Sequence, residues 1–192
     1  MQFDGDSFDN RTFEDVQDIP ARLIDKEFTG CTFKRCNFSG CEFTGTTFIH
    51  CAFSGCNFSN ILVGGCGFQD ASFEGCKILG VSFEGLKTWL LSWKFKNCRL
   101  ELCVFKKLDL KRTQLIDCEI RDTEFENVDL SEAVFTGSDL QGSFFQKVIL
   151  KKADFVGATN YYIDPIQNEL TEASFAYPEV LSLLAGFRIK VQ

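Results

Sequence analysis

The stretch CTFKRCNFSGCEF, residues 31–43, decides the fold because it repeats one pattern every five residues. Phenylalanine recurs at this spacing, with cysteine two residues before it. The pattern runs from Phe28 to Phe83, shifts by two residues, and resumes from Phe95 to Phe155 with aliphatic residues at some of its centres. Of the 22 phenylalanines, 20 fall on these two frames, so composition bias cannot explain the pattern.

A strict period of five fits neither a free helix nor a free strand, but it fits a strand that turns a corner after each repeat. The phenylalanine, which we call the centre, and the small residue two before it share a face and are expected to point inward. Glycine often follows two residues after the centre, where it suits a tight bend. Such short repeats bury their apolar face only by stacking, which predicts a β-helix.

The small-x-Phe/Leu-x-x register resembles the pentapeptide repeat family over about residues 28–175. This resemblance implies an all-β fold, a right-handed quadrilateral β-helix with about 20 residues per coil. The runs 76–81, 142–143, 160–165 and 178–184 are similar to the Qnr group of topoisomerase-protecting proteins. Projecting loops contribute to protection in that group. This chain has no counterpart to the first loop, and a short bulge at residues 86–94 would be the second.

The length of 192 residues predicts one domain with a continuous core. We expect the β-helix to span residues 1–175, with an irregular first coil at 1–27 and a frame break at 86–94. Residues 176–192 are expected to form a capping and dimerising helix and strand. Neither a signal peptide nor a membrane span is evident, which favours a cytoplasmic protein.

The ten cysteines raise the question of a metal or redox centre. Each occupies the small position that elsewhere holds alanine, so we interpret them as small core residues. Thiols spread along a rod cannot converge on one ion. We therefore expect buried, reduced thiols and neither a metal nor a cofactor, although Cys36, Cys56 and Cys76 would stack closely enough for an oxidant to join them.

Two extra residues displace the frame near residue 90, where both tryptophans lie. Trp93 falls at a small position and is expected inside. In a solenoid, insertions emerge on one face and often bind, so Thr88, Trp89 and Leu90 are predicted partner-binding residues. Folding back onto the rod is the alternative.

Charged residues in the second half of the chain come in blocks of alternating sign. One coil apart, these blocks would form ion-pair ladders, for example Lys106 beside Glu126. The pairing leaves over Glu119, Asp122 and Asp139, a modest acidic stripe that we predict to contact a partner. Residues 1–27 carry eight acids and three bases, which fits a solvated cap better than a second partner site.

Pro178 is expected to open a short helix that Gly186 would close. The tail holds more apolar residues than capping requires, which predicts a homodimer. The residues expected at this dimer interface are Leu181, Leu184, Phe187 and Ile189.

The sequence lacks a nucleophile elbow, a phosphate loop and metal ligands, so we expect no catalytic residues and no enzyme activity. A passive scaffold is compatible with the regular repeat. An acidic rod could instead imitate DNA by presenting carboxylates in place of phosphates. The Qnr resemblance implies such a mimic, one that binds DNA gyrase or topoisomerase IV, protects it from quinolones or natural toxins, and does not itself bind nucleic acid.

Overall fold

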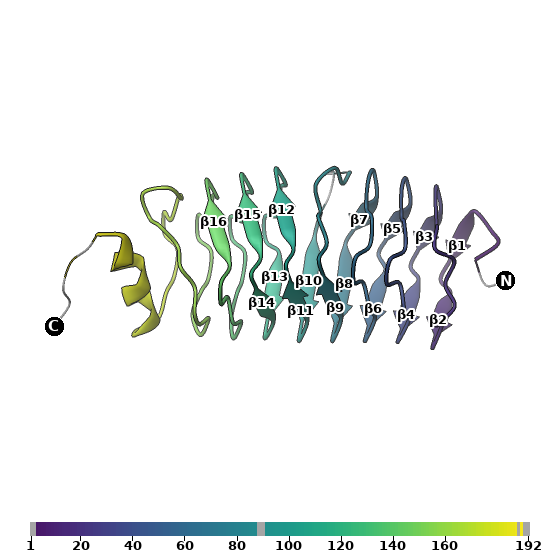
Figure 1. The fold of residues 1–192 in the computed structure, drawn as a ribbon, viewed down its shortest axis with the longest axis horizontal. Helices are drawn as coiled ribbons and strands as arrows, with labels where there is room; N and C mark the ends of the chain where they lie inside the picture. The colour runs from purple at the N-terminus through teal and green to yellow at the C-terminus, as the bar shows by residue number, and fades with distance from the viewer. Residues whose placement is uncertain (1–2, 88–90, 188, 190–192) are drawn as a thin grey trace.

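The computed structural model, which describes residues 3–87, 91–187 and 189, shows a rod of stacked coils with a short helix at its C-terminal end (Figure 1). Each coil contributes to four faces, and the strands of neighbouring coils pair in parallel. The predicted quadrilateral β-helix is therefore confirmed.

The strands are three or four residues long because each face holds one repeat before the chain bends. The first face carries β1 (Ser7–Asp9), β3 (Glu27–Thr29), β5 (Thr47–Ile49) and β7 (Gly67–Gln69). The second carries β2 (Thr12–Glu14), β4 (Thr32–Lys34), β6 (Ala52–Ser54), β8 (Ala71–Glu74), β10 (Trp93–Lys96) and β13 (Gln114–Ile116). The third carries β9 (Lys77–Leu79), β11 (Arg99–Glu101) and β14 (Glu119–Arg121), and the fourth β12 (Val104–Lys106), β15 (Glu124–Glu126) and β16 (Phe144–Gln146).

The centres fill the interior and stack along the rod. The rings of Phe28 and Phe48 lie 5.0 Å apart and nearly parallel, and those of Phe33 and Phe53 lie 4.9 Å apart. Rings on adjoining faces meet edge to face. Each buried phenylalanine stabilises the fold by roughly 2–3 kcal/mol, so these columns are the main source of stability.

The small position beside the centre is also buried along most of the rod, and a thiol or hydroxyl there usually donates to a backbone carbonyl, although the Thr113 hydroxyl has no partner. The Cys51 thiol donates a hydrogen bond to the backbone carbonyl of Phe28, 3.3 Å away. The Thr46 hydroxyl makes the equivalent bond to Leu23 at 2.6 Å. A thiol and a hydroxyl can thus make the same bond at this position, and all ten cysteines are buried and form no disulfide.

The corners between faces hold residues in the left-handed backbone region. On the corner between the third and fourth faces, Gly142 has a φ of 71° and Asp122, one coil earlier, a φ of 48°. The Asp122 carboxylate occupies the space that a Cβ on Gly142 would take. Glycine is needed at residue 142 because this neighbour leaves no room for a side chain.

The frame break adds two residues to one coil. Strand partners are 22 positions apart across it, as in Ala71 and Trp93, and 20 positions apart on both sides. Trp93 is buried, as predicted, and its indole N–H donates to the Phe68 carbonyl at 2.8 Å. Thr88, Trp89 and Leu90, the predicted binding residues of the bulge, lie outside the described residues.

The last coil departs from the repeat in the opposite direction. Phe144 pairs with Tyr162, 18 positions later, and the ring of Tyr161 fills the interior beside Phe155 and Phe175. The predicted short helix is present as a 3₁₀ helix, η1 (Glu179–Phe187), which includes Gly186 instead of ending before it. The strand expected after it falls mostly outside the described residues.

Candidate protein-binding surface

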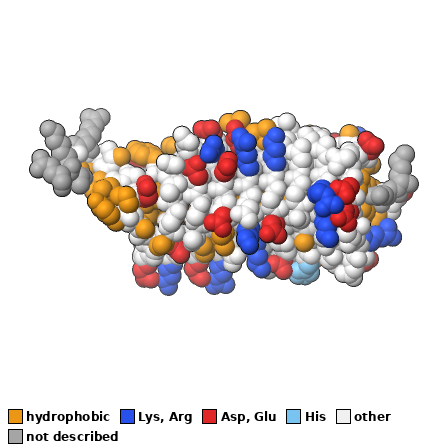
Figure 2. Space-filling model, turned by 90° about the horizontal axis from the view of Figure 1, so that it is seen from below, with side chains coloured by type: hydrophobic (Ala, Val, Ile, Leu, Met, Phe, Trp, Pro, Cys, Tyr) orange, Lys and Arg blue, Asp and Glu red, His pale blue; other side chains and the backbone are white. Residues whose placement is uncertain are grey.

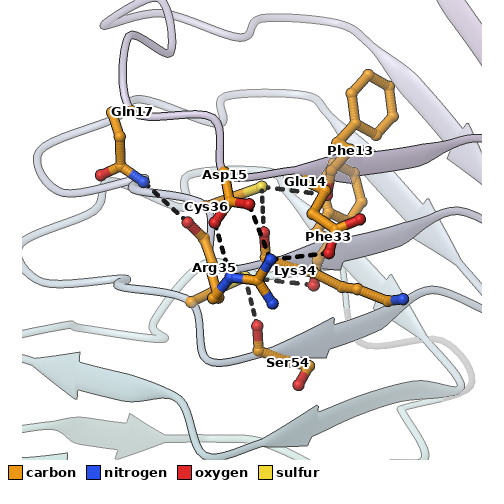
Figure 3. A network of polar contacts seen from close by, with 10 residues as sticks. Phe13, Glu14, Asp15, Gln17, Phe33, Lys34, Arg35, Cys36 and Ser54 are labelled. Atoms are coloured by element: carbon orange, nitrogen blue, oxygen red, sulfur yellow. Dashed lines mark hydrogen bonds and ion pairs between the residues drawn. The ribbon is translucent and has the colours of Figure 1, made fainter.

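The acidic N-terminal coil is tied to the next coil by ion pairs (Figure 3). The Arg35 guanidinium lies 2.8 Å from Glu14 and 2.7 Å from Asp15. Its hydrogen bond lowers the pKa of the Asp15 carboxyl. The Gln17 side chain donates to the Arg35 carbonyl at 2.9 Å. These contacts fit the predicted cap, because the acids bind this rod's own cation.

The charge ladders predicted for the second half are present. Lys106 pairs with Glu126, and Arg112 lies 3.0 Å from Glu132. Figure 2 shows side chains of both signs alternating along this side of the rod. These exposed pairs add little to stability because solvent screens them, and they reduce the net field of the surface.

Two residues of the predicted acidic stripe, Glu119 and Asp139, face each other on adjoining coils of the third face, but they are not left over from ion pairing as the sequence suggested. Arg121 lies between them, 3.1 Å from Asp139 and 3.9 Å from Glu119. Burial alone would raise the pKa of Asp139. The hydrogen bonds that its carboxylate accepts, with the one from Asn160 having the largest effect, outweigh burial and lower its pKa below the ordinary value. Asp139 is thus engaged within the rod, whereas Asp122 stands on the next corner.

A depression of about 560 Å³ lies beside the frame break. Its lining contains both charge signs and the buried side chain of Leu91. The lining residues are Gln69, Asp70, Leu91, Ser92, Asp109, Lys111 and Arg112. Lys111 pairs with Asp109 and Asp129, and Arg112 pairs with Glu132, so its cations already have partners.

The ten thiols lie in the core of the rod. Among the described residues, no group of three or more histidine, cysteine or acidic side chains could hold a metal ion. Burial raises the pKa of Cys51 to about 12 and that of Cys103 to about 11, so both thiols are protonated at neutral pH. A protonated thiol is a poor nucleophile and a poor metal ligand.

At the C-terminal end, the predicted interface residues form an exposed apolar surface. Leu181, Phe187 and Ile189 are exposed, and Leu184 is half-buried on η1. Figure 2 shows hydrophobic side chains gathering at this end of the rod. Within the described part of the chain, no helix is long and apolar enough to cross a membrane.

Two exposed aromatic residues lie on the fourth face and were not among the residues that the sequence singled out. Phe144 and Tyr162 pair on adjoining coils, with their side chains outside. The sequence did contain a signal, because Phe144 and Phe187 are the two phenylalanines that leave the repeat frame. A single exposed apolar residue is ordinary, but Phe144 and Tyr162 lie side by side and so form a small continuous patch.

Comparisons with known proteins agree with this architecture. The family model described as "Pentapeptide repeat region" matches residues 26–89 and 87–155. The fold is similar to two structures of trypsin-treated QnrB1, a plasmid-mediated fluoroquinolone resistance protein. The first is 18% identical with a TM-score of 0.55, covering 97% of this chain and 100% of that chain. The second is 21% identical with a TM-score of 0.52, covering 100% and 93%.

Another solved structure is HetL, a pentapeptide repeat protein involved in heterocyst differentiation regulation from the cyanobacterium Nostoc. It is 14% identical with a TM-score of 0.48, covering 88% of this chain and 86% of that chain. No curated protein matches the sequence significantly. At these identities, the likeness to the two QnrB1 structures shows the fold alone.

Proposed function

Because this chain belongs to the pentapeptide repeat family, we propose that it is a binding protein that contacts a type II topoisomerase, DNA gyrase or topoisomerase IV, and protects it from quinolones or natural gyrase toxins. The observation that carries the proposal is the likeness to QnrB1, which extends over 97% of this chain. The similarity of the runs at residues 160–165 and 178–184 to the Qnr group supports it.

The proposed mode of action is imitation of DNA. The rod has a net charge of −7, and its carboxylates would occupy positions where a DNA-binding groove accepts phosphates. The protein itself would not bind nucleic acid. It would act in the cytoplasm, where its target works, without a cofactor.

We also propose that two copies associate through residues 176–192. Leu181, Phe187 and Ile189 support this arrangement because they leave an apolar surface at the end of the rod. An isologous contact there would join two rods end to end on a two-fold axis. Type II topoisomerases are themselves two-fold symmetric, so such a dimer could engage both halves of the enzyme.

A supercoiling assay with purified gyrase tests the main proposal. We expect the protein to restore supercoiling in the presence of ciprofloxacin at concentrations where it does not inhibit gyrase alone. The matched control is Leu184→Asp. We expect this variant to fold as a monomer and not to protect gyrase in the assay. If the wild-type protein neither binds gyrase nor changes the inhibitory concentration of the drug, the protein is a scaffold or has an unrelated partner.

A further inference from the structure

The C-terminal half of the fourth face carries an exposed aromatic pair that has no role in the protein's own core. Phe144 is 48% exposed and Tyr162 is 50% exposed. They are register partners on adjoining coils, so their backbones are about 4.8 Å apart. The other aromatic side chains with comparable exposure in the described chain, Tyr177 and Phe187, lie beyond the last coil.

Two carboxylates lie next to this pair. Glu124 is the register partner of Phe144 on the preceding coil, and Asp122 stands on the corner just before it. Within the described residues, neither acid lies within ion-pair distance of a cation, although the charge of Glu124 also acts on Lys106. The nearby cations are already engaged, since Lys106 pairs with Glu126 and Arg121 with Asp139.

We propose that these four residues, Asp122, Glu124, Phe144 and Tyr162, form an aromatic and acidic patch that binds arginine side chains of a partner protein. A guanidinium group can stack on an aromatic ring and pair with a carboxylate at the same time. The spacing of one coil places a ring and a carboxylate within reach of one such group. A lysine ammonium is more strongly hydrated and lacks the planar surface that stacks, so it would bind less well.

For the topoisomerase, the inference rests on the proposed function and names the face that makes the contact. Surfaces that bind DNA phosphates are rich in arginine because a planar fork matches phosphate oxygens. A pure polyanion would attract any such surface. Flat rings beside the carboxylates add a preference for arginine and an apolar stacking contact that salt weakens less than it weakens a pair of exposed charges.

The first experiment measures gyrase binding by surface-immobilised protein at two salt concentrations. Phe144→Ser with Tyr162→Ser is compared with Leu62→Ser, which changes an outward residue of the same face four coils earlier that is 61% exposed. We expect the double variant to lose about tenfold or more in affinity and the control to match the wild type. Equal affinity for the double variant and the wild type would overturn the proposal while leaving gyrase binding intact.

A second experiment does not depend on gyrase. The full-length protein, labelled with ¹⁵N, is titrated with an Arg-Gly-Gly repeat peptide and with the matched Lys-Gly-Gly peptide. We expect larger amide shifts around Phe144 and Tyr162 with the arginine peptide, and their loss in Asp122→Asn with Glu124→Gln. Equal responses to both peptides, or none at this patch, would overturn arginine recognition.

Light scattering tests the other possible occupant of the patch, which is a second copy of this chain. If the Phe144→Ser, Tyr162→Ser variant changes from dimer to monomer, the patch is a contact between copies and the proposal is wrong. If the oligomeric state is unchanged and the arginine peptide binds while gyrase does not, the patch stands with another partner and the proposed topoisomerase function fails.

Discussion

Phe53 and Phe144 show how the same residue type serves two purposes in this rod. Phe53 stacks between Phe33 and Phe73, whereas the Phe144 ring faces outward. Phe53→Ala should lower the free energy of unfolding by about 3–5 kcal/mol, since stacked coils cannot collapse into the cavity. Phe144→Ala should cost under about 1 kcal/mol. Urea denaturation measures both, and equal losses would contradict the assignment of inward and outward positions.

The corner glycines offer a second test at the residue scale. Gly75→Ala should destabilise the fold by about 1 kcal/mol, because alanine is strained at a φ of 60° but meets no neighbour. Gly142→Ala should cost at least about 1 kcal/mol more, because its Cβ would meet the Asp122 carboxylate. Adding Asp122→Ala should recover part of that loss. If the double variant is no more stable than Gly142→Ala alone, backbone strain accounts for the whole loss of stability.

The buried thiols predict a pH dependence. Burial raises the pKa of Cys41 to about 11 and that of Cys51 to about 12, above the ordinary value near 8.5. The folded state thus holds these protons more tightly, so their contribution to stability is complete below pH about 8.5 and is lost as the pH rises toward the folded values.

Ellman's reagent should react slowly with native protein and fully in denaturant. Rapid reaction at neutral pH would contradict the buried positions.

At the scale of elements, η1 has a face that its own rod does not use. Leu183 packs against the core, while Leu181 and Phe187 remain exposed. Leu184→Asp should give a folded monomer that no longer binds gyrase, because a charge at an apolar contact is costly. Light scattering and a pull-down measure the two effects. Leu62→Asp is the matched control, and a monomeric wild type would mean that the tail only caps the rod.

The sequence predicted the elements that obey the repeat and the position of Trp93, because burial of the centres imposes a fixed spacing. It could not show that Arg121 pairs with Asp139, since that contact depends on side-chain rotamers between coils. The place of Tyr161 was equally hidden. Its ring enters the core where the coil is two residues short, and this becomes visible only when the pairing of Phe144 with Tyr162 is known.

For the whole molecule, stability is distributed along one axis because, in the described part of the chain, the backbone of each coil pairs only with the coils next to it. The side chain of Lys87, which donates to the Gly45 carbonyl two coils away, is an added link. A substitution should therefore act locally. Phe53→Ala should lower the hydrogen-exchange protection of amides in β4, β6 and β8, while amides in β14 and β15 stay close to wild type. Uniform loss of protection along the rod would show that it unfolds as one cooperative unit.

Because each coil of about 20 residues adds one strand spacing, the number of coils sets the length of the rod. Duplicating one coil would lengthen the rod by a single strand spacing, about 4.8 Å, and would leave every other contact unchanged. The break at residues 86–94 shows that a corner can absorb additional residues without disturbing the coils around it. The length of the rod can thus change by duplication of coils, while its loops change independently by insertion of residues at a corner.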